Sequence, residues 1–193
     1  MIFATNNQNK LKELQDIFKE YTIKSLKDYN INVDIEETGS SFYENALIKA
    51  KAIYDLTKIP TIADDSGLIF EELVDYPGIY TKRIENDAEK EGLTRNEFLI
   101  KIGKTLKNKN IKAICNLVYY DGKNIISATG IMSGTITDKE YPGNGFGFDS
   151  IFKLSDGRIV SSLSSDEKNK LSHRYQASVN LKKKLDDNKI NGN

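Results

Sequence analysis

The sequence predicts a mixed α/β fold. Apolar residues recur with a period of two in some segments, which is typical of strands, and with a period near 3.6 in others, which is typical of helices. The 193 residues are enough to bury a substantial core without disulfides. No internal repeat, linker-like stretch or step in composition divides the sequence. We therefore expect a single domain over residues 1–193.

Four segments carry the helical period. They are residues 8–21, 41–57, 94–106 and a long tail at 164–187. The first segment has an apolar stripe of Leu11, Leu14, Ile17 and Phe18. In the second segment we expect Ala46, Ile53 and Leu56 to face inward, and Pro60 lies beyond the end of the helix.

Strand-like segments occupy much of the remaining chain. They are IFAT at the start, TIADDSGLIF at 61–70, and three runs, IKAICNLVYYDG, NIISATGIM and SGTITDKEY, between residues 111 and 141. The three runs predict an antiparallel meander, in which Asp121-Gly122 is a hairpin turn signal. The glycine-rich stretch GNGFGFDSIF predicts a loop followed by another strand.

Composition excludes several classes of function. With 28 basic and 28 acidic residues the net charge is zero, so the molecule as a whole has no field that would attract nucleic acid or a membrane surface. A single cysteine, Cys115, lies in an apolar run, where a small buried hydrophobe is favoured over a reactive thiol. There is no signal-peptide pattern and no run of ~18 uncharged apolar residues, and we expect a cytoplasmic location.

The junction between the first strand and the first helix, TNNQNK, is a candidate anion site. Backbone N–H groups and the positive end of the helix dipole favour an anion there, whereas Lys10 in the first turn is unfavourable for the helix itself. A bound phosphate would resolve that conflict. The alternative is that Asn7 is a plain helix N-cap and that Lys10 is solvated. No Walker-type phosphate loop is present.

Two acidic positions are candidate metal ligands. Asp64 and Asp65 are adjacent inside an apolar strand, where ionised carboxylates require a partner such as a divalent cation. Because successive strand side chains point to opposite faces, we expect only one of the two to enter a site directly. A polar turn at Asp-Ser-Gly is the alternative. Glu44 could also bind metal, but Ser41-x-x-Glu44 is a capping box that accounts for it structurally.

Two further segments are candidate ligand contacts. In GNGFGFD, at 143–149, glycines permit close backbone approach and Phe146 and Phe148 offer faces for stacking a base, although two core phenylalanines in a plain loop fit equally well. Ser172-His173-Arg174 spans about 200° of a helix, so either the helix breaks near Ser172 or the three residues do different jobs. His173, the single histidine, excludes multi-histidine metal sites and is most simply structural.

Taken in order, these motifs resemble the inosine triphosphatase family, whose members remove deaminated purine nucleotides. The segments that carry the resemblance are TNNQNK, SFYENALIKA, ADDSGL, PGIYTKRI, GFGFDSIF and EKNKLSHRYQA. They extend from the amino terminus to about residue 181. The resemblance implies an elongated mixed sheet flanked by helices that form two lobes around a central cleft, usually in a homodimer.

The resemblance also implies roles for individual residues. Glu44 and Asp65 would hold Mg²⁺, and Asp65 would also accept a proton. The substrate-binding residues would be Thr5, Asn6, Asn7, Gln8, Asn9, Lys10, Ser66, Phe146, Gly147, Phe148, Asp149, Lys168, His173 and Arg174. Asn6 stands where the family has glycine, which we expect to be tolerated because asparagine visits left-handed backbone conformations. Ser150 stands in place of a proline, so the shape of the base pocket is less well defined.

The implied reaction is hydrolysis of non-standard purine nucleoside triphosphates (ITP, dITP, XTP) to the monophosphate and pyrophosphate. Water attacks the α-phosphorus, and catalysis is mainly positioning and charge neutralisation. Arg174 has only donors, so it suits the 6-oxo group of hypoxanthine or xanthine and not the 6-amino group of adenine. A phosphohydrolase for pyrimidine or modified nucleotides, and a module that senses a nucleotide without turnover, are the alternative functions.

Overall fold

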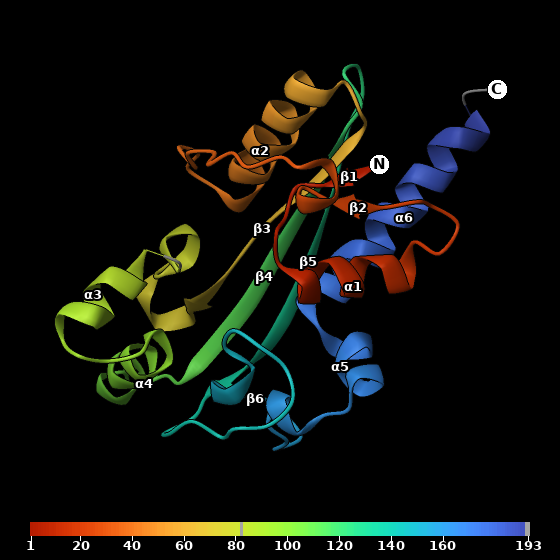
Figure 1. Cartoon of the computed structure of the whole chain (residues 1–193). Coiled ribbons are helices and arrows are strands. Elements are labelled where there is room, and N and C mark those ends of the chain that lie inside the picture. Colours follow the sequence, from red (N-terminus) through yellow and green to blue (C-terminus); the bar gives the residue numbers. More distant parts are fainter. Residues whose placement is uncertain (82, 192–193) are drawn as a thin grey trace. The chain divides into compact units, whose positions relative to one another are not determined.

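The computed structural model describes residues 1–81 and 83–191, and its strands form one mixed sheet (Figure 1). The strand order is β2-β1-β3-β4-β5-β6. The strands are β1 Ile2–Phe3, β2 Lys24–Ser25, β3 Thr61–Phe70, β4 Asn110–Tyr120, β5 Ile125–Ile136 and β6 Phe152–Lys153. Strand β1 pairs in parallel with β2 and β3, whereas β5 and β6 are antiparallel. The predicted α/β class with a mixed sheet flanked by helices is confirmed.

The predicted helices begin close to their expected positions, although α1 ends at Ile17, four residues before its predicted end. They are α1 Gln8–Ile17, α2 Phe42–Thr57, α3 Ile84–Lys90, α4 Arg95–Thr105, α5 Ser165–Leu171 and α6 His173–Asn191. The predicted helical tail is two helices, because Ser172 has an extended backbone (φ −67°, ψ 146°) that ends α5. Of the two alternatives that the sequence left open, a break of the helix near Ser172 is therefore confirmed. Helix α3 was not predicted.

The predicted meander is wrong in one respect. The second and third β-like runs form a single strand, β5, which continues through Ser133-Gly134 without a turn. This strand position requires glycine, because a Cβ at Gly134 would come within 2.3 Å of the Lys153 carbonyl oxygen on β6. The predicted hairpin at Asp121-Gly122 is confirmed: the Asp121 carboxylate accepts the N–H groups of Lys123 (3.0 Å) and Asn124 (2.6 Å), and Gly122 has a φ of +93°.

The chain divides into two compact units. Unit 1 comprises Met1–Ser66, Cys115–Gly130 and the chain from His173 onward, and unit 2 comprises Gly67–Ile114 and Ile131–Ser172. Strands β3, β4 and β5 each contribute residues to both units. The single domain predicted over residues 1–193 stays a prediction.

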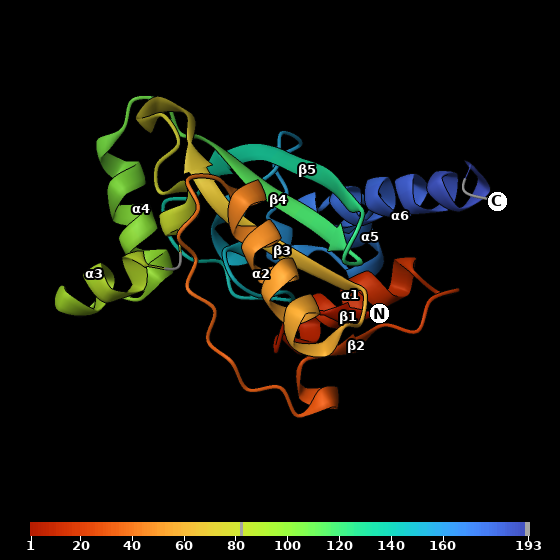
Figure 2. The same ribbon diagram turned by 90° about the horizontal axis from the view of Figure 1, so that it is seen from above.

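In unit 1, helices cover both faces of the sheet (Figures 1 and 2). Helices α1 and α6 pack with Ile62 and Leu117 in one cluster, whereas α2 packs with Ala63 and Val118 in another. Residues 62 and 63, and residues 117 and 118, are neighbours along β3 and β4, so their side chains project from opposite faces. The alternation within the strands therefore assigns α1 and α6 to one face and α2 to the other.

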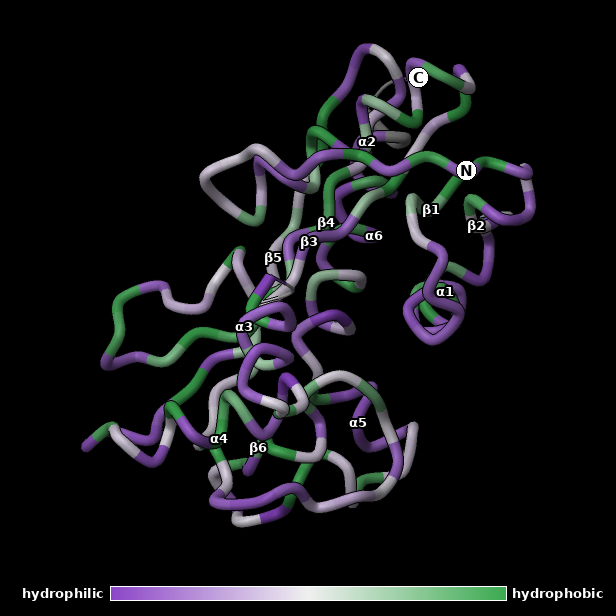
Figure 3. Tube along the Cα trace, turned by 60° about the vertical axis from the view of Figure 1, so that its left-hand side comes forward, coloured by the Kyte–Doolittle hydropathy of each residue, from purple (hydrophilic) through white to green (hydrophobic). Residues whose placement is uncertain are grey.

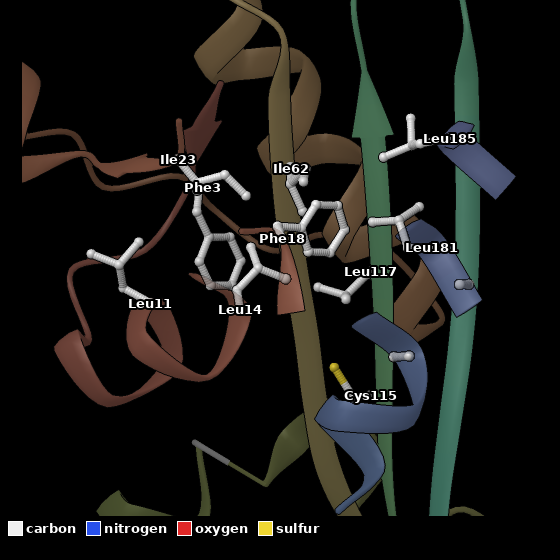
Figure 4. Packing of buried hydrophobic residues seen from close by; sticks show 12 residues of the cluster. Phe3, Leu11, Leu14, Phe18, Ile23, Ile62, Cys115, Leu117, Leu181 and Leu185 are labelled. Atoms are coloured by element: carbon white, nitrogen blue, oxygen red, sulfur yellow. The ribbon is translucent and has the colours of Figure 1, made fainter. Parts of the chain in front are cut away.

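Helix α1 is held by its apolar stripe. Leu14 and Phe18 are fully buried and Leu11 is nearly so, whereas the rest of the helix is largely hydrophilic (Figure 3). Figure 4 shows Leu11, Leu14 and Phe18 packed around Phe3 and Ile62. Burial of each large side chain contributes roughly 1.5–3 kcal/mol to folding. The predicted stripe is confirmed, with Ile17 only partly buried.

Helix α2 differs from the prediction at one position. Its buried residues include Ala46, Ala50 and Ile53, whereas Leu56 is 60% exposed. At ~100° per residue, Leu56 lies about 65° from the centre of the buried face, and it is in the last turn of the helix. The expectation that Leu56 faces inward was therefore wrong.

Cys115 is a free, fully buried thiol on β4 in unit 1. Burial raises its pKa to about 12. A thiol with so high a pKa is unreactive at neutral pH, which confirms the interpretation of Cys115 as a small buried hydrophobe.

Unit 2 has its own core. Residues from β3, β4, β5, α3 and α4 form one cluster with Ile151, Phe152 and Val160. Helix α4 begins at a complete capping box, in which Thr94 and Glu97 satisfy each other's backbone N–H groups. Among the residues that the structure describes, no helix is long and apolar enough to span a membrane.

We expect Gly130→Ala to destabilise the protein by about 1–3 kcal/mol or more. A Cβ at Gly130 on β5 would lie 1.9 Å from the His173 carbonyl oxygen and 2.5 Å from the Ala177 amide nitrogen, so α6 would have to move away from the sheet. Urea unfolding measures the loss. Ser133→Ala, at an exposed position of the same strand, is the control. Equal stability of Gly130→Ala and the parent would contradict the close approach of α6 to β5.

Candidate active site

Two adjacent aspartates in β3 organise the candidate site in unit 1. Asp64 and Asp65 are 2% and 8% exposed. Asp64 pairs with Lys10 on α1 and Arg174 on α6, whereas Asp65 contacts Asn45 and Lys49 on α2. The two carboxylates therefore point to opposite faces of the sheet, as the strand alternation predicts. The alternative of a polar turn at Asp-Ser-Gly is excluded, because β3 continues through it.

Asp64 is compensated by two cations. Its Oδ2 lies 2.8 Å from Lys10 Nζ and 3.5 Å from Arg174 Nη2. Burial alone would raise the pKa of Asp64, but the charges of Lys10, Arg174 and Lys49 outweigh it and hold the pKa well below its usual range. Asp64 is therefore ionised at neutral pH, and its charge is balanced by the protein itself.

Arg174 is held by groups of unit 1. Its Nη1 donates to Glu13 Oε2 (2.9 Å) and its Nη2 donates to Ser66 Oγ (3.1 Å). The side chain is 5% exposed. A guanidinium fork bonded to two partners in this way has a fixed orientation. Glu13 was not among the predicted site residues.

Asp65 has a different environment. Asn45 Nδ2 donates to Oδ2 (2.9 Å), Ser66 N donates to Oδ1 (2.9 Å), and Lys49 Nζ lies 3.9 Å from Oδ1. Burial raises the pKa of Asp65 to about 6, although Lys49 and the Asn45 hydrogen bond act in the opposite direction. A further positive charge nearby would therefore stabilise the ionised form of Asp65.

Lys49 supplies the nearest cation to Asp65. Its Nζ lies 2.8 Å from Glu37 Oε1, and the side chain is 15% exposed. Burial would lower its pKa, but the charges of Asp64, Asp65 and Glu37 outweigh that effect and raise it. Lys49 therefore stays charged in a largely buried position. Asn45 and Lys49 lie in the segment SFYENALIKA but were not among the predicted site residues, although their i, i+4 spacing places both on one helix face.

Glu44 differs from its predicted capping role. Ser41 Oγ accepts the Glu44 N–H (3.2 Å), which is half of the expected box. The Glu44 carboxylate, however, accepts the N–H (2.7 Å) and hydroxyl (2.8 Å) of Ser40 and not the Ser41 N–H. These Ser40 bonds lower the pKa of Glu44, and its side chain is exposed. Glu44 is adjacent in the chain to Asn45, which contacts Asp65.

The amino-terminal junction forms an exposed turn between β1 and α1. Asn7 caps α1, because its side chain accepts the N–H groups of Asn9 (3.0 Å) and Lys10 (3.3 Å). Lys10, however, pairs with Asp64 and is not simply solvated. Residues 6–9 are exposed, whereas Thr5 is buried. Asn6 does not have a positive φ, so its tolerance at that position does not depend on a left-handed backbone.

His173 and Arg174 begin α6. His173 is 5% exposed, and its carbonyl oxygen lies against Gly130 on β5. In unit 1 the structure thus joins Lys10, Ser66 and Arg174 around Asp64. It places the exposed side chains Asn6, Gln8 and Asn9 at the start of α1 without a described contact to that group.

Unit 2 contains a second cluster of predicted residues. Lys168 Nζ lies 2.7 Å from Asp149 Oδ2 and 4.2 Å from the Phe146 ring centroid, and Asp149 Oδ2 also accepts the Phe146 N–H (2.8 Å). Gly145, with φ +104°, has no room for a Cβ, which would lie 2.3 Å from Asp149 Oδ2. Phe148 packs against the core of unit 2, so the alternative of core phenylalanines holds for Phe148.

A divalent cation fits the donor set of unit 1. No three His, Cys, Asp or Glu side chains gather into a ligand cage within residues 1–81 and 83–191. Mg²⁺, however, is usually bound by one or two carboxylates together with water and substrate phosphates. Asp65, whose pKa is raised by burial, and Glu44, which precedes in the chain the Asn45 that contacts Asp65, carry hard oxygen donors of that kind.

A mixed sheet with a buried acid pair, of which one member is compensated by two cations, beside a helix N-terminus defines an α/β protein suited to a polyanionic ligand. Over residues 1–184 the sequence matches the Ham1 family. The chain belongs to this family.

Individual relatives support the same family assignment. The chain is 37% identical to the dITP/XTP pyrophosphatase of Aquifex aeolicus over 92% of each chain, and 38% identical to that of Caldanaerobacter subterraneus over 97% of this chain and 98% of the relative. The solved Ham1 protein of Staphylococcus aureus superposes with a TM-score of 0.84 at 31% identity, covering 97% of this chain and 98% of that chain. The resemblance inferred from the motifs is confirmed.

We expect Asp64→Ala to lower the free energy of unfolding at pH 7 by about 3–5 kcal/mol, because it removes the carboxylate that compensates the buried Arg174 and the half-buried Lys10. The folded-state pKa of Asp64 lies below the unfolded value of about 3.9. Its contribution is therefore present above that pH and is lost as the pH falls toward the folded-state pKa. The difference between parent and variant should shrink from pH 7 to pH 3.

Urea unfolding at both pH values measures this difference. Asp55→Ala is the control, because Asp55 forms an exposed pair with Lys58 in the same unit and should contribute less than about 1 kcal/mol. A pH-independent difference between Asp64→Ala and the parent would contradict the electrostatic origin.

Proposed function

We propose that this protein hydrolyses non-standard purine nucleoside triphosphates, ITP, dITP and XTP, to the monophosphate and pyrophosphate and so removes them from the nucleotide pool. The observation that carries the proposal is the unequal compensation of the acid pair: Asp64 is neutralised by Lys10 and Arg174, whereas Asp65 keeps a pKa of about 6. The names of the relatives, dITP/XTP pyrophosphatases, support the same activity.

Asp65 is the proposed proton acceptor. A general base is most effective when its pKa lies near the working pH. Burial raises the pKa of Asp65 to about 6, which is closer to neutral pH than the pKa of an ordinary aspartate. Attack of water on the α-phosphorus requires removal of one proton from that water as pyrophosphate leaves. Lys10 and Lys49, on opposite faces of β3, are the proposed partners for phosphate oxygens.

The proposed metal ligands are Glu44 and Asp65. Mg²⁺ held there would neutralise phosphate charge and lower the pKa of a bound water. The exposed turn from Asn6 to Asn9, with Thr5 and Lys10, is the proposed triphosphate contact in unit 1. Ser66 is proposed to touch the substrate beside Asp65.

The remaining proposed substrate contacts rest on the family resemblance. In unit 2 they are Phe146, Gly147, Phe148, Asp149 and Lys168, and in unit 1 they are His173 and Arg174. Phe146 and Lys168 already form a cation–aromatic pair, which suits contact with a base or a phosphate. If Arg174 binds the 6-oxo group, one of its N–H groups must leave its present acceptor, Glu13 or Ser66, and donate to the base instead.

The two alternative functions differ in their observable products. A pyrimidine or modified-nucleotide phosphohydrolase would consume a different set of triphosphates. A nucleotide sensor would bind without turnover, but the Asp65 carboxylate, whose nearest described cation is 3.9 Å away, would repel phosphate unless a metal ion intervened. By the family resemblance and the composition, we also propose a cytoplasmic homodimer.

We expect the purified protein with Mg²⁺ to convert ITP, dITP and XTP to monophosphate and pyrophosphate far faster than ATP or pyrimidine triphosphates. Chromatography of nucleotides and separate assays of phosphate and pyrophosphate identify the bond cleaved. Excess chelator should abolish the reaction, because the triphosphate charge is then no longer offset. Inorganic phosphate as the first product, or full activity in chelator, would refute the proposal.

A second experiment separates the metal role of Glu44 from its hydrogen bonds to Ser40. Glu44→Gln retains an oxygen that accepts those bonds but removes the negative charge. We expect thermal stability to change little, and the Mg²⁺ concentration for half-maximal activity to rise at least about tenfold, since a lost charge-assisted contact is worth roughly 1.5–3 kcal/mol.

Glu167→Gln is the matched control for Glu44→Gln. Glu167 also accepts the N–H (3.0 Å) and hydroxyl (2.9 Å) of a single serine, Ser164, at the start of a helix. It has no proposed metal role. An identical Mg²⁺ dependence in Glu44→Gln, Glu167→Gln and the parent would remove Glu44 from the metal site.

A further inference from the structure

Asn45 lies between a loop and the proposed general base. Its side chain is on α2 in unit 1, and the residue is 1% exposed. Nδ2 donates to Asp65 Oδ2 (2.9 Å), and Oδ1 accepts the backbone N–H of Gly39 (2.8 Å). Both ends of the amide are therefore satisfied inside the protein.

The direction of this amide is determined by its partners. The Gly39 N–H can only donate, so it must face the amide oxygen, and an ionised carboxylate can only accept, so it must face the amide nitrogen. Turning the Asn45 amide over would place like groups against each other at both ends. The hydrogen bond from Asn45 to Asp65 thus has one possible sense.

This bond restricts the Asp65 carboxylate. Asn45 holds Oδ2, and the Ser66 N–H, at 2.9 Å, holds Oδ1. Asn45 is neutral, so it orients the carboxylate without neutralising it. Lys49, at 3.9 Å, is the cation closest to the carboxylate among its described contacts.

Gly39 fits this arrangement because it has no side chain. A Cβ at Gly39 would lie 2.8 Å from Asn45 Oδ1, 2.9 Å from Asn45 N and 2.6 Å from Glu44 Cβ. A larger residue would push the loop away from the first turn of α2 and so remove the acceptor bond that fixes Asn45.

We infer that Asn45 is the positioning residue that sets the orientation of the Asp65 carboxylate for proton transfer, and that Gly39 holds Asn45 in place. The inference rests on the proposed function of Asp65. Proton transfer needs donor and acceptor atoms about 2.6–3.2 Å apart, and a displacement of ~1 Å can lower a rate about 100-fold. Asn45 acts only through Asp65 and does not contact the substrate.

Kinetics of Asn45→Ala and Gly39→Ala test the inference, with ITP and Mg²⁺ as substrate and metal. We expect kcat to fall about 10- to 100-fold in each variant. KM and the Kd for inorganic pyrophosphate, measured by calorimetry, should stay within about threefold of the parent, since a positioning residue affects the chemical step alone. Asn116→Ala, which deletes another side-chain hydrogen bond of unit 1, the one from Thr129, is the control and should retain the parent kcat.

A double-mutant cycle separates positioning from a general structural effect. In an Asp65→Asn background, Asn45→Ala should lower the residual rate less than about twofold, because the group on which it acts is already lost. The same fractional loss in both backgrounds would overturn the inference. So would a full kcat in Asn45→Ala, or a weakened affinity for pyrophosphate with kcat retained.

Hydrogen exchange in the parent requires no variant to fold. The side-chain amide protons of Asn45 should exchange with solvent much more slowly than those of exposed asparagines, because they are buried and bonded to Asp65. Rapid exchange would overturn the inference even if both variants misfold. A parent that hydrolyses no triphosphate would instead refute the proposed function, so the two failures are distinguishable.

Discussion

The pairing of Asp64 with Lys10 and Arg174 is the interaction on which the rest of unit 1 depends. A buried carboxylate is tolerated only with compensating charge, and here that charge comes from two helices far apart in sequence. Helix α1 must therefore begin beside β3, and α6 must begin where Arg174 reaches the same carboxylate. The break at Ser172 and the absence of a side chain at Gly130 allow that approach.

Adjacent acids on one strand acquire opposite properties because the two faces of the sheet differ. The face toward α1 and α6 supplies two cations to Asp64 and lowers its pKa, whereas the face toward α2 supplies an amide and a more distant lysine to Asp65, whose pKa rises to about 6. Environments that push the pKa values of two neighbouring carboxylates apart separate a structural role from a reactive one. Asp64 is paired with two cations of the protein, and Asp65 is the member of the pair that we propose to be reactive.

Local patterns predicted much of this arrangement, because helical stripes, the N-cap at Asn7 and the alternation of Asp64 and Asp65 depend on neighbours in sequence. The partners of Asp65 could not be predicted from local patterns, because Asn45 and Lys49 contact it only when α2 packs against the face of β3 that carries Asp65. Likewise, Ser133-Gly134 resembles a turn in sequence. The glycine is instead required inside β5, because it leaves room for the backbone of Lys153, and this contact cannot be seen in the sequence.

The alternation within β3 also limits how this chain can vary in length. Removing or adding one residue between Thr61 and Asp64 would shift the register by one and send each later side chain to the opposite face. Asp65 would then meet the cations of α1 and α6, and the residue preceding it would face Asn45. Insertions are tolerable in surface loops such as that between β4 and β5. The four residues Thr61–Asp64, in contrast, must keep their number for the two acids to keep their separate surroundings.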